Sequence, residues 1–229
     1  VGKLKMVLQC FGVGFLLINK PKDWTSHDVV AAIRKVTGEK RVGHAGTLDP
    51  FAMGLLIVGV GRAATKRLDE FKALPKTYRA TVQLGYTSDT DDITGAVIAS
   101  SDRSRGEAIS RPLLEVVLAK FIGKQLQIPP MYSAKKIKGK KLYELARKGI
   151  TVERAPQPIE IFEIKLLNWN EAENKLEIEV KCSSGTYIRT LCRDIGAVLG
   201  VGAYCAALER TAIGEYSVRD AMSVTDIKL

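Results

Sequence analysis

The sequence is poor in the residues that usually bind metals, with only two histidines and four cysteines and no C-x-x-C pair. Structural zinc sites need clusters of such ligands, so the cysteines are best interpreted as buried or incidental thiols. It also lacks an apolar run of about 20 residues, the length that spans a bilayer. The first 20 residues show no secretory cleavage pattern. We therefore expect no metal, no membrane association and a cytoplasmic location.

Acidic residues are outnumbered by basic ones, 25 against 35, which gives a net charge of +10. A surplus of this sign suits a polyanionic partner such as nucleic acid. Hydrophobic residues make up 46% of the 229 positions, enough to bury a substantial core. No internal repeat or low-complexity linker interrupts the chain. We expect a single domain over residues 1–229.

Hydrophobic periodicity predicts more strands than helices. The pattern predicts a helix with Ser26 as N-cap and Gly38 at its C-terminus, and further helices over 61–71, 106–122 and 186–200. Strands are predicted over 14–19, 55–60, 76–86, 95–100, 159–169 and 175–182, and a strand or hairpin over 202–218. Because several strands come in hairpin-like pairs, we expect an α+β fold with a mixed, mostly antiparallel sheet flanked by helices and loops.

The stretch GHAGTLDPFAMGLL, residues 43–56, places His44 and Asp49 among glycines before an apolar run. Glycine permits positive φ or close approach of another molecule, and Pro50 fixes the chain after the aspartate. The loop is therefore suited to presenting Asp49. Simpler uses are also open, because the histidine is a common loop residue and the aspartate a common cap. A serine hydrolase is not supported, since no G-x-S-x-G motif is present.

An acidic stretch, SDTDDITG at residues 88–95, invites a calcium or magnesium site. Ile93 occupies the third ligand position of a calcium loop, and no glutamate closes that loop at the required spacing. We favour an Asx-type turn between two strands, with a bound cation as the open alternative.

The segment over 125–150 combines two prolines, lysines and tyrosines, which resembles an excursion from the core. Cations contact phosphates, and tyrosine rings offer surfaces on which unpaired bases stack. We interpret it as a basic RNA-binding insertion, against the alternative of a solvated helix face. The predicted RNA contacts are Lys135, Lys136, Lys138, Lys140, Lys141 and Arg147.

Motifs along residues 14–222 together resemble the bacterial tRNA pseudouridine-55 synthase family, TruB. The resemblance depends on GFLLINKPKDWTSHDVV, VGHAGTLDPFAMGLLIVGVGRAATK, KTYRATVQLG, TSDTDDITG, QIPPMYSAKKIKGKKLYELARKG, VKCSSGTYIRTLCRDIG and LERTAIGEYSV, in consistent order. A chance match to one short motif does not produce such an order. The extra alanine in GRAATK is a departure from the family pattern.

The resemblance implies a pseudouridine synthase fold and isomerisation of uridine to pseudouridine at position 55, in the TΨC loop of tRNA. It implies that Asp49 is the catalytic aspartate and that Tyr78 stacks on the target base. Tyr187 and Arg189 match active-site partners, and Leu208 matches a residue that lines the pocket.

The resemblance also implies that His44 helps hold the rearranged RNA loop, and Lys20 is assigned to RNA contact. The family usually continues into a small C-terminal RNA-binding domain of the PUA type, which we expect to be absent here. Because reactant and product are isomers, no cofactor and no metal are expected. The expected partner is the TΨC stem-loop of tRNA, with no obligate protein partner.

The chemistry of the residues agrees with these roles. A base stacked in a folded loop must be flipped out, which costs a few kcal/mol that stacking on Tyr78 and His44 would offset. Asp49 must be ionised, although burial alone would raise its pKa, so a cation is needed and Arg189 is the candidate. The carboxylate then attacks C1′, stabilises positive charge there, or accepts a sugar proton.

Two other function classes stay open at this point. One is a non-catalytic RNA-binding protein or tRNA-folding chaperone that uses the same basic surface. The other is a metal-dependent hydrolase built on Asp89, Asp91 and Asp92.

Overall fold

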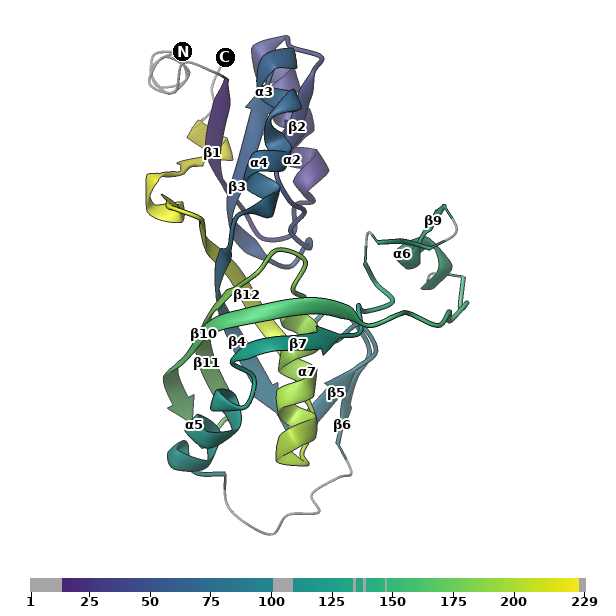
Figure 1. The fold of residues 1–229 in the computed structure, drawn as a ribbon, viewed down its shortest axis with the longest axis vertical. Coiled ribbons are helices and arrows are strands. Elements are labelled where there is room, and N and C mark those ends of the chain that lie inside the picture. Colours follow the sequence, from purple (N-terminus) through teal and green to yellow (C-terminus); the bar gives the residue numbers. More distant parts are fainter. Residues whose placement is uncertain (1–13, 101–108, 134, 138, 147, 227–229) are drawn as a thin grey trace. The chain divides into compact units, whose positions relative to one another are not determined.

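The structure, a computed structural model, describes residues 14–100, 109–133, 135–137, 139–146 and 148–226. The chain divides into two compact units, the first over Val1–Arg79 and Leu208–Leu229 and the second over Ala80–Ala207. Two long strands, β4 (Lys76–Leu84) and β12 (Ala203–Ile213), contribute residues to both units (Figure 1). We describe each unit by itself, and a single catalytic domain stays a prediction.

The first unit contains a mixed sheet. Strand β1 (Phe15–Lys20) pairs antiparallel with β3 (Met53–Val60) and parallel with β14 (Met222–Ser223). Strand β3 also pairs antiparallel with β2 (Val42–His44) and parallel with β12, which turns back into β13 (Tyr216–Ser217). Two 3-10 turns, η1 (Val218–Asp220) and η2 (Val224–Asp226), flank β14.

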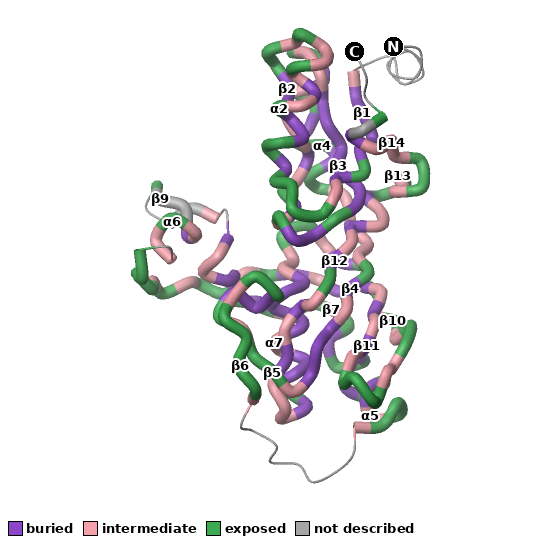
Figure 2. Tube along the Cα trace, turned by 180° about the vertical axis from the view of Figure 1, so that it is seen from behind, coloured by how far each residue is buried: buried purple, intermediate pink, exposed green. Residues whose placement is uncertain are grey.

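Strands β1 and β3 are buried on both faces, as the purple tube along β3 shows in Figure 2. On one face, Phe15 and Leu17 pack with side chains of α3 (Arg62–Lys66) and α4 (Leu68–Ala73). On the other face, Leu16 and Ile18 pack with α2 (Ser26–Thr37). Because strand side chains alternate between faces, continuous apolar runs such as these occur where helices cover both sides.

The N-cap of helix α2 lies one residue earlier than predicted. Thr25 is the N-cap, because its hydroxyl accepts from the Asp28 backbone while the Asp28 carboxylate accepts from the Thr25 backbone. This reciprocal capping box satisfies two helix-end donors, and it leaves the hydroxyl of Ser26 for another use. Gly38 ends the helix with a positive φ of 69°, as predicted.

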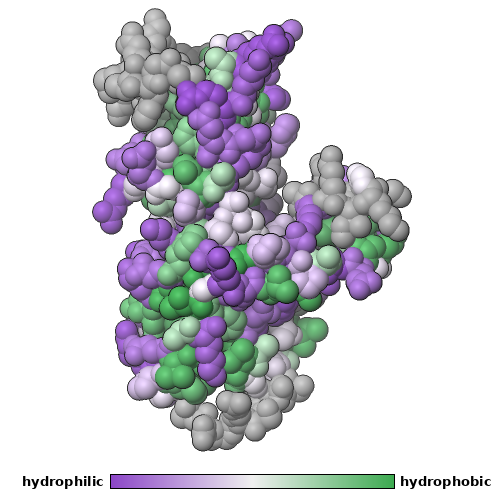
Figure 3. Space-filling view, viewed as in Figure 1, coloured by the Kyte–Doolittle hydropathy of each residue, from purple (hydrophilic) through white to green (hydrophobic). Residues whose placement is uncertain are grey.

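The second unit is built on an antiparallel sheet. Strand β10 (Gln157–Asn170) pairs antiparallel with β11 (Lys175–Cys182) and with β7 (Gly123–Gln127), and β4 follows β11 in the strand order. Buried residues of α7 (Ile188–Leu199) and α5 (Arg111–Ala119) complete its core. Hydrophobic side chains also reach the surface around β7 and β10 (Figure 3), where Leu126 is 70% exposed.

Two short antiparallel ribbons stand outside this sheet. The predicted strand over 95–100 is β6 (Val97–Ala99), and it pairs with β5 (Tyr86–Ser88) rather than with β4. Gly85, at a φ of 84°, separates β5 from β4, so the two do not form one continuous strand. The basic insertion leaves the sheet between β7 and β10 and contains β8 (Lys136–Ile137), β9 (Lys140–Lys141) and α6 (Leu142–Ala146).

The predicted α+β class with a mostly antiparallel sheet is confirmed. Cys182, Cys192 and Cys205 are buried free thiols, as predicted, and Cys10 lies outside the described residues. Among the helices described, none is long and apolar enough to cross a bilayer.

Candidate active site

Asp49 lies half-buried in the loop between β2 and β3, and the residues beside it are anchored. Ser26, at the start of α2, accepts from Leu48 N at 2.9 Å and donates to Leu48 O at 3.2 Å through the same hydroxyl. Ala52 N donates to Asp49 O at 3.1 Å, and Asp23 N donates to Pro50 O at 2.8 Å. The backbone that carries the carboxylate is thus fixed on both sides.

Lys20 reinforces this loop from the end of β1, and its side chain is completely buried. The amine donates to the carbonyl oxygens of Trp24 at 2.6 Å, Pro21 at 2.9 Å and Pro50 at 3.2 Å. The predicted RNA contact at Lys20 is therefore replaced by a role inside the protein. Burial lowers the pKa of Lys20 to about 8, while the negative charge of Asp49 opposes that shift.

Three other predicted residues also belong to the first unit. His44 is half-buried at the end of β2, where it pairs with Val58. Burial and, secondarily, the Arg210 guanidinium lower the pKa of the His44 imidazole below its ordinary value. Tyr78 is half-buried on β4, and Leu208 on β12 is 7% exposed.

Arg210 had no predicted role, yet it is among the largest fully buried side chains of the described residues. Its guanidinium donates to backbone carbonyls of β3 and of the Asp49 loop. The residue stands within the quoted motif LERTAIGEYSV, on a predicted strand.

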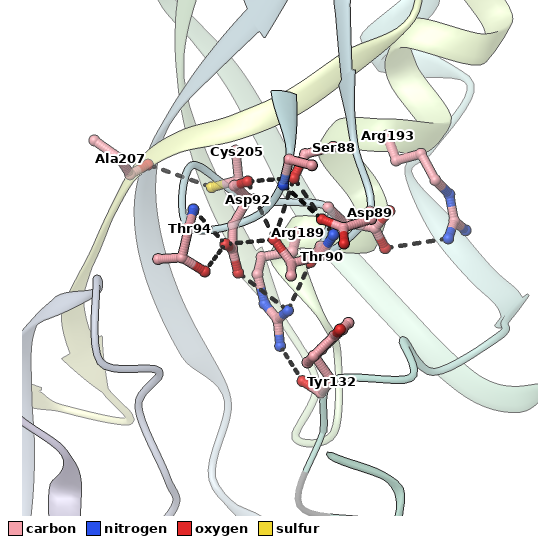
Figure 4. Close-up of polar contacts among 12 residues, drawn as sticks. Ser88, Asp89, Thr90, Asp92, Thr94, Tyr132, Arg189, Arg193, Cys205 and Ala207 are labelled. Atoms are coloured by element: carbon pink, nitrogen blue, oxygen red, sulfur yellow. Dashed lines mark hydrogen bonds and ion pairs between the residues drawn. The ribbon is translucent and has the colours of Figure 1, made fainter. Parts of the chain in front are cut away.

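Arg189, in the second unit, is buried in a polar cluster at the start of α7 (Figure 4). Its Nη1 lies 3.2 Å from Asp92 Oδ2, and the two side chains are 3% and 5% exposed. The same guanidinium donates to Thr90 O at 2.9 Å and to Tyr132 O at 2.8 Å. A planar fork that meets a carboxylate and two carbonyls is held in one orientation.

The acidic stretch forms the predicted turn. Asp92 Oδ1 accepts from Thr94 N at 2.9 Å, which closes an Asx turn, and from the hydroxyls of Thr90 and Thr94. Asp89 accepts from Ala96 N, and Asp91 pairs with Arg193 at 3.2 Å. These carboxylates are engaged with protein donors, and the described residues contain no group of three or more acidic, histidine or cysteine side chains placed to hold a metal ion.

The remaining predicted residues belong to the start of α7 and to the basic insertion. Tyr187 is the N-cap of α7, and its backbone exchanges two hydrogen bonds with the Gln127 side chain, at 2.8 and 3.0 Å. Lys136, Lys140 and Lys141 lie on the β8–β9 ribbon beside Lys135. Lys138 and Arg147 lie outside the described residues.

Comparison with known proteins gives concordant matches over nearly the whole chain. Residues 34–188 match the TruB family pseudouridylate synthase N-terminal domain, and residues 189–229 match the tRNA pseudouridylate synthase B C-terminal domain. The tRNA pseudouridine synthase B of Trichormus variabilis is 45% identical over 216 residues, covering 94% of this chain and 72% of that relative. The protein of the same name from Desulfotalea psychrophila is 46% identical, covering 96% and 89%.

The chain belongs to the TruB family of pseudouridylate synthases.

Among solved structures, the TruB-family chain is similar to one in the crystal structure of a Cbf5-Nop10-Gar1 complex, with a TM-score of 0.71 and 26% identity. That match covers 97% of this chain but only 55% of the other, so the chain spans about half the length of that protein. The likeness supports the pseudouridine synthase fold predicted for this TruB-family member.

Proposed function

We propose that this protein isomerises uridine to pseudouridine at position 55, in the TΨC loop of tRNA, with Asp49 as the catalytic carboxylate. Family membership makes it a tRNA pseudouridine synthase, an isomerase. The observation that carries the proposed site is the anchoring of Asp49: Ser26 holds Leu48 before it, and Lys20 holds Pro50 after it. A carboxylate fixed in this way is preorganised for attack or charge stabilisation.

The target uridine must leave its stack before the carboxylate reaches the ribose. Tyr78 and His44 are the proposed substitutes for the neighbouring bases. Burial and the Arg210 charge keep the pKa of His44 low, so its ring is neutral at neutral pH and is suited to stacking. Leu208 supplies apolar surface to the same pocket in this proposal, and Tyr187 is a further active-site partner.

The reaction breaks the N1–C1′ bond and rejoins the base through C5, so it consumes no second substrate. Asp49 is suited to three routes: attack on C1′, stabilisation of positive charge at C1′, or removal of a sugar proton. Each route needs the ionised carboxylate, and Arg189 is the residue proposed to balance its charge. In the structure this guanidinium is paired with Asp92, so its role toward Asp49 is proposed from the family resemblance alone.

Affinity for tRNA is proposed to come from phosphate contacts by the basic insertion, including Lys135 and its neighbours. Binding should then weaken steeply with salt, because phosphate contacts release condensed counterions. Specificity would come from the shape of the folded TΨC arm. The proposed place of action is the cytoplasm.

The test uses an unmodified tRNA transcript and maps pseudouridine by chemical labelling and primer extension. Wild-type protein should modify position 55, and a transcript with cytidine there should stay unmodified. Asp49→Asn should abolish the product and leave tRNA affinity unchanged, because only the charge is removed. Asp69→Asn is the matched control, since Asp69 is an exposed carboxylate of the same unit, paired with Lys72.

Two outcomes would overturn parts of this proposal. Product at another uridine refutes the assigned position, while the isomerase activity stands. Parallel loss of affinity and activity in Asp49→Asn means that Asp49 has a structural role.

A further inference from the structure

Arg210 is a cation placed inside the first unit, where it is 1% exposed. Strand β12 runs parallel to β3, with Arg210 opposite Gly54 and Glu209 opposite Met53. A buried guanidinium loses its hydration and is tolerated only where protein acceptors replace the water. The carbonyl oxygens that accept hydrogen bonds from the Arg210 guanidinium therefore indicate which parts of the chain this residue holds together.

The guanidinium joins β3 to the loop that precedes Asp49. Nε donates to Leu55 O at 2.8 Å, Nη2 donates to Gly46 O at 3.1 Å, and Nη1 donates to Thr47 O at 3.5 Å. Three carbonyls are thus bound by one rigid planar group, and two of them lie two and three residues before Asp49. A lysine ammonium donates all its hydrogen bonds from one nitrogen, so it does not reproduce the spacing of this planar fork.

Two glycines with positive φ lie beside Arg210. Gly54 has a φ of 105°, and a Cβ there would collide with the backbone of Arg210. Gly46 has a φ of 95°, and a Cβ there would lie 3.6 Å from Arg210 Nη1. Glycine therefore permits the positive φ at both positions, and at Gly54 it also permits the close approach of the β12 backbone.

The positive charge of Arg210 also reaches residues on both sides of Asp49. It contributes to lowering the pKa of His44, before Asp49 in the chain, and the pKa of Lys20, whose amine binds Pro50. The other groups that act on the His44 imidazole are Lys72 and His27, which also lower its pKa, and the Gly46 backbone, which raises it. Arg210 is therefore electrically coupled to the loop that it supports.

We propose that Arg210 is a positioning residue for catalysis: its guanidinium fixes the Gly46–Thr47 backbone, and thereby the carboxylate of Asp49, and supplies positive charge to that loop. This inference rests on the proposed function of Asp49. The competing interpretation is that Arg210 only stabilises the β3–β12 pairing. The two interpretations predict different results for Arg210 variants. Only a positioning role predicts that the rate of pseudouridine formation falls by more than the loss of stability explains.

The kinetic test compares Arg210→Lys and Arg210→Met with matched changes at Arg34. Arg34 belongs to α2 and donates Nη2 to Val42 O at 3.0 Å, so it too is an arginine of the first unit that binds a backbone carbonyl. Arg210→Lys should lower the single-turnover rate by about 100-fold, the effect of a misplacement near 1 Å. Affinity for tRNA should be unchanged, and Arg34→Lys should keep the wild-type rate.

An NMR titration gives a readout that is independent of activity. The chain has only two histidines, so the signal of the His44 imidazole is readily assigned. In Arg210→Met the pKa of His44 should rise, because a nearby positive charge has been removed. Arg34→Met should leave the pKa of His44 at its wild-type value.

The results separate this inference from the proposed function. If wild-type protein forms no pseudouridine in tRNA, the proposed function fails and the catalytic role of Arg210 fails with it. If wild-type protein is active and Arg210→Lys is equally fast, only the inference fails. It also fails if His44 titrates identically with and without Arg210, or if rate, affinity and thermal stability fall in proportion.

Discussion

Buried cations are held in opposite ways in the two units. In the first unit, the described hydrogen bonds of Lys20 and Arg210 end on backbone carbonyl oxygens around the Asp49 loop. In the second unit, the buried Arg189 meets the buried carboxylate of Asp92 (Figure 4). One arrangement keeps its formal positive charge, whereas the other is a pair of zero net charge.

The carbonyl-bound cations of the first unit act on their surroundings through their charge, whereas the ion pair of the second unit acts by fixing geometry. Carbonyl dipoles solvate a cation without neutralising it, so its field still acts on nearby titratable groups. Burial is the main cause of the lowered pKa values of Lys20 and His44, and the Arg210 charge adds to both shifts. A buried ion pair instead fixes geometry, and removing one partner leaves a buried charge uncompensated.

The largest effect is expected from breaking the ion pair between Arg189 and Asp92. Asp92→Ala should lower the free energy of unfolding by about 3–5 kcal/mol, because Arg189 loses its carboxylate in a buried site. Urea denaturation measures this change. Asp89→Ala is the control from the same turn, since Asp89 is exposed and accepts only one described hydrogen bond, from Ala96 N. Equal losses in the two variants would show that the pair is no more than a surface contact.

The second prediction concerns Lys20 in the first unit and the pH dependence of the single-turnover rate. The pKa of Lys20 is lowered to about 8, so the ammonium is present below that pH and is lost as pH rises through it. The single-turnover rate should therefore fall about tenfold per pH unit above this point, as expected when one protonated group is required. Stopped-time assays between pH 7 and 9.5 would show this alkaline limb.

Variants identify the group responsible for that limb. Lys20→Met should be slower and independent of pH in this range. Lys76→Met should keep the wild-type limb, because Lys76 is also a buried lysine that donates to carbonyls, but it does so at the end of α4. Arg210→Met should move the limb to higher pH, since Arg210 contributes to lowering the Lys20 pKa. An unchanged limb in Lys20→Met would refute the assignment.

Much of the fold was predictable from local sequence. Gly38 ends α2, the apolar runs of β1 and β3 are buried, and the 159–182 pattern forms the β10–β11 hairpin. These features depend on periodicity and on turn residues, which act over a few positions. The partner of β6 was only partly predictable, because Gly85 divides the strand predicted over 76–86, and β6 pairs with β5, which begins at Tyr86.

The candidate site was predictable as a list of residues but not as a set of contacts. Lys20 appears in the sequence as one basic residue among many, and its burial depends on the distant carbonyl of Pro50. Arg210 binds Gly46 from 164 positions away, a separation at which periodicity carries no information. Sequence reasoning therefore identifies residue types that suit the chemistry, while the long-range contacts that orient them require the fold.

The smallest expected effect distinguishes two adjacent hydroxyls at the start of α2. Thr25→Ala removes the helix cap and Ser26→Ala removes the contacts to Leu48, so each should cost about 1 kcal/mol of unfolding free energy. Only Ser26→Ala should slow pseudouridine formation, because only Ser26 touches the backbone next to Asp49. Urea denaturation and single-turnover rates, measured on both variants, give the comparison. Equal rates would mean that anchoring Leu48 serves stability alone, and the support of Asp49 would then depend on Lys20 and Arg210.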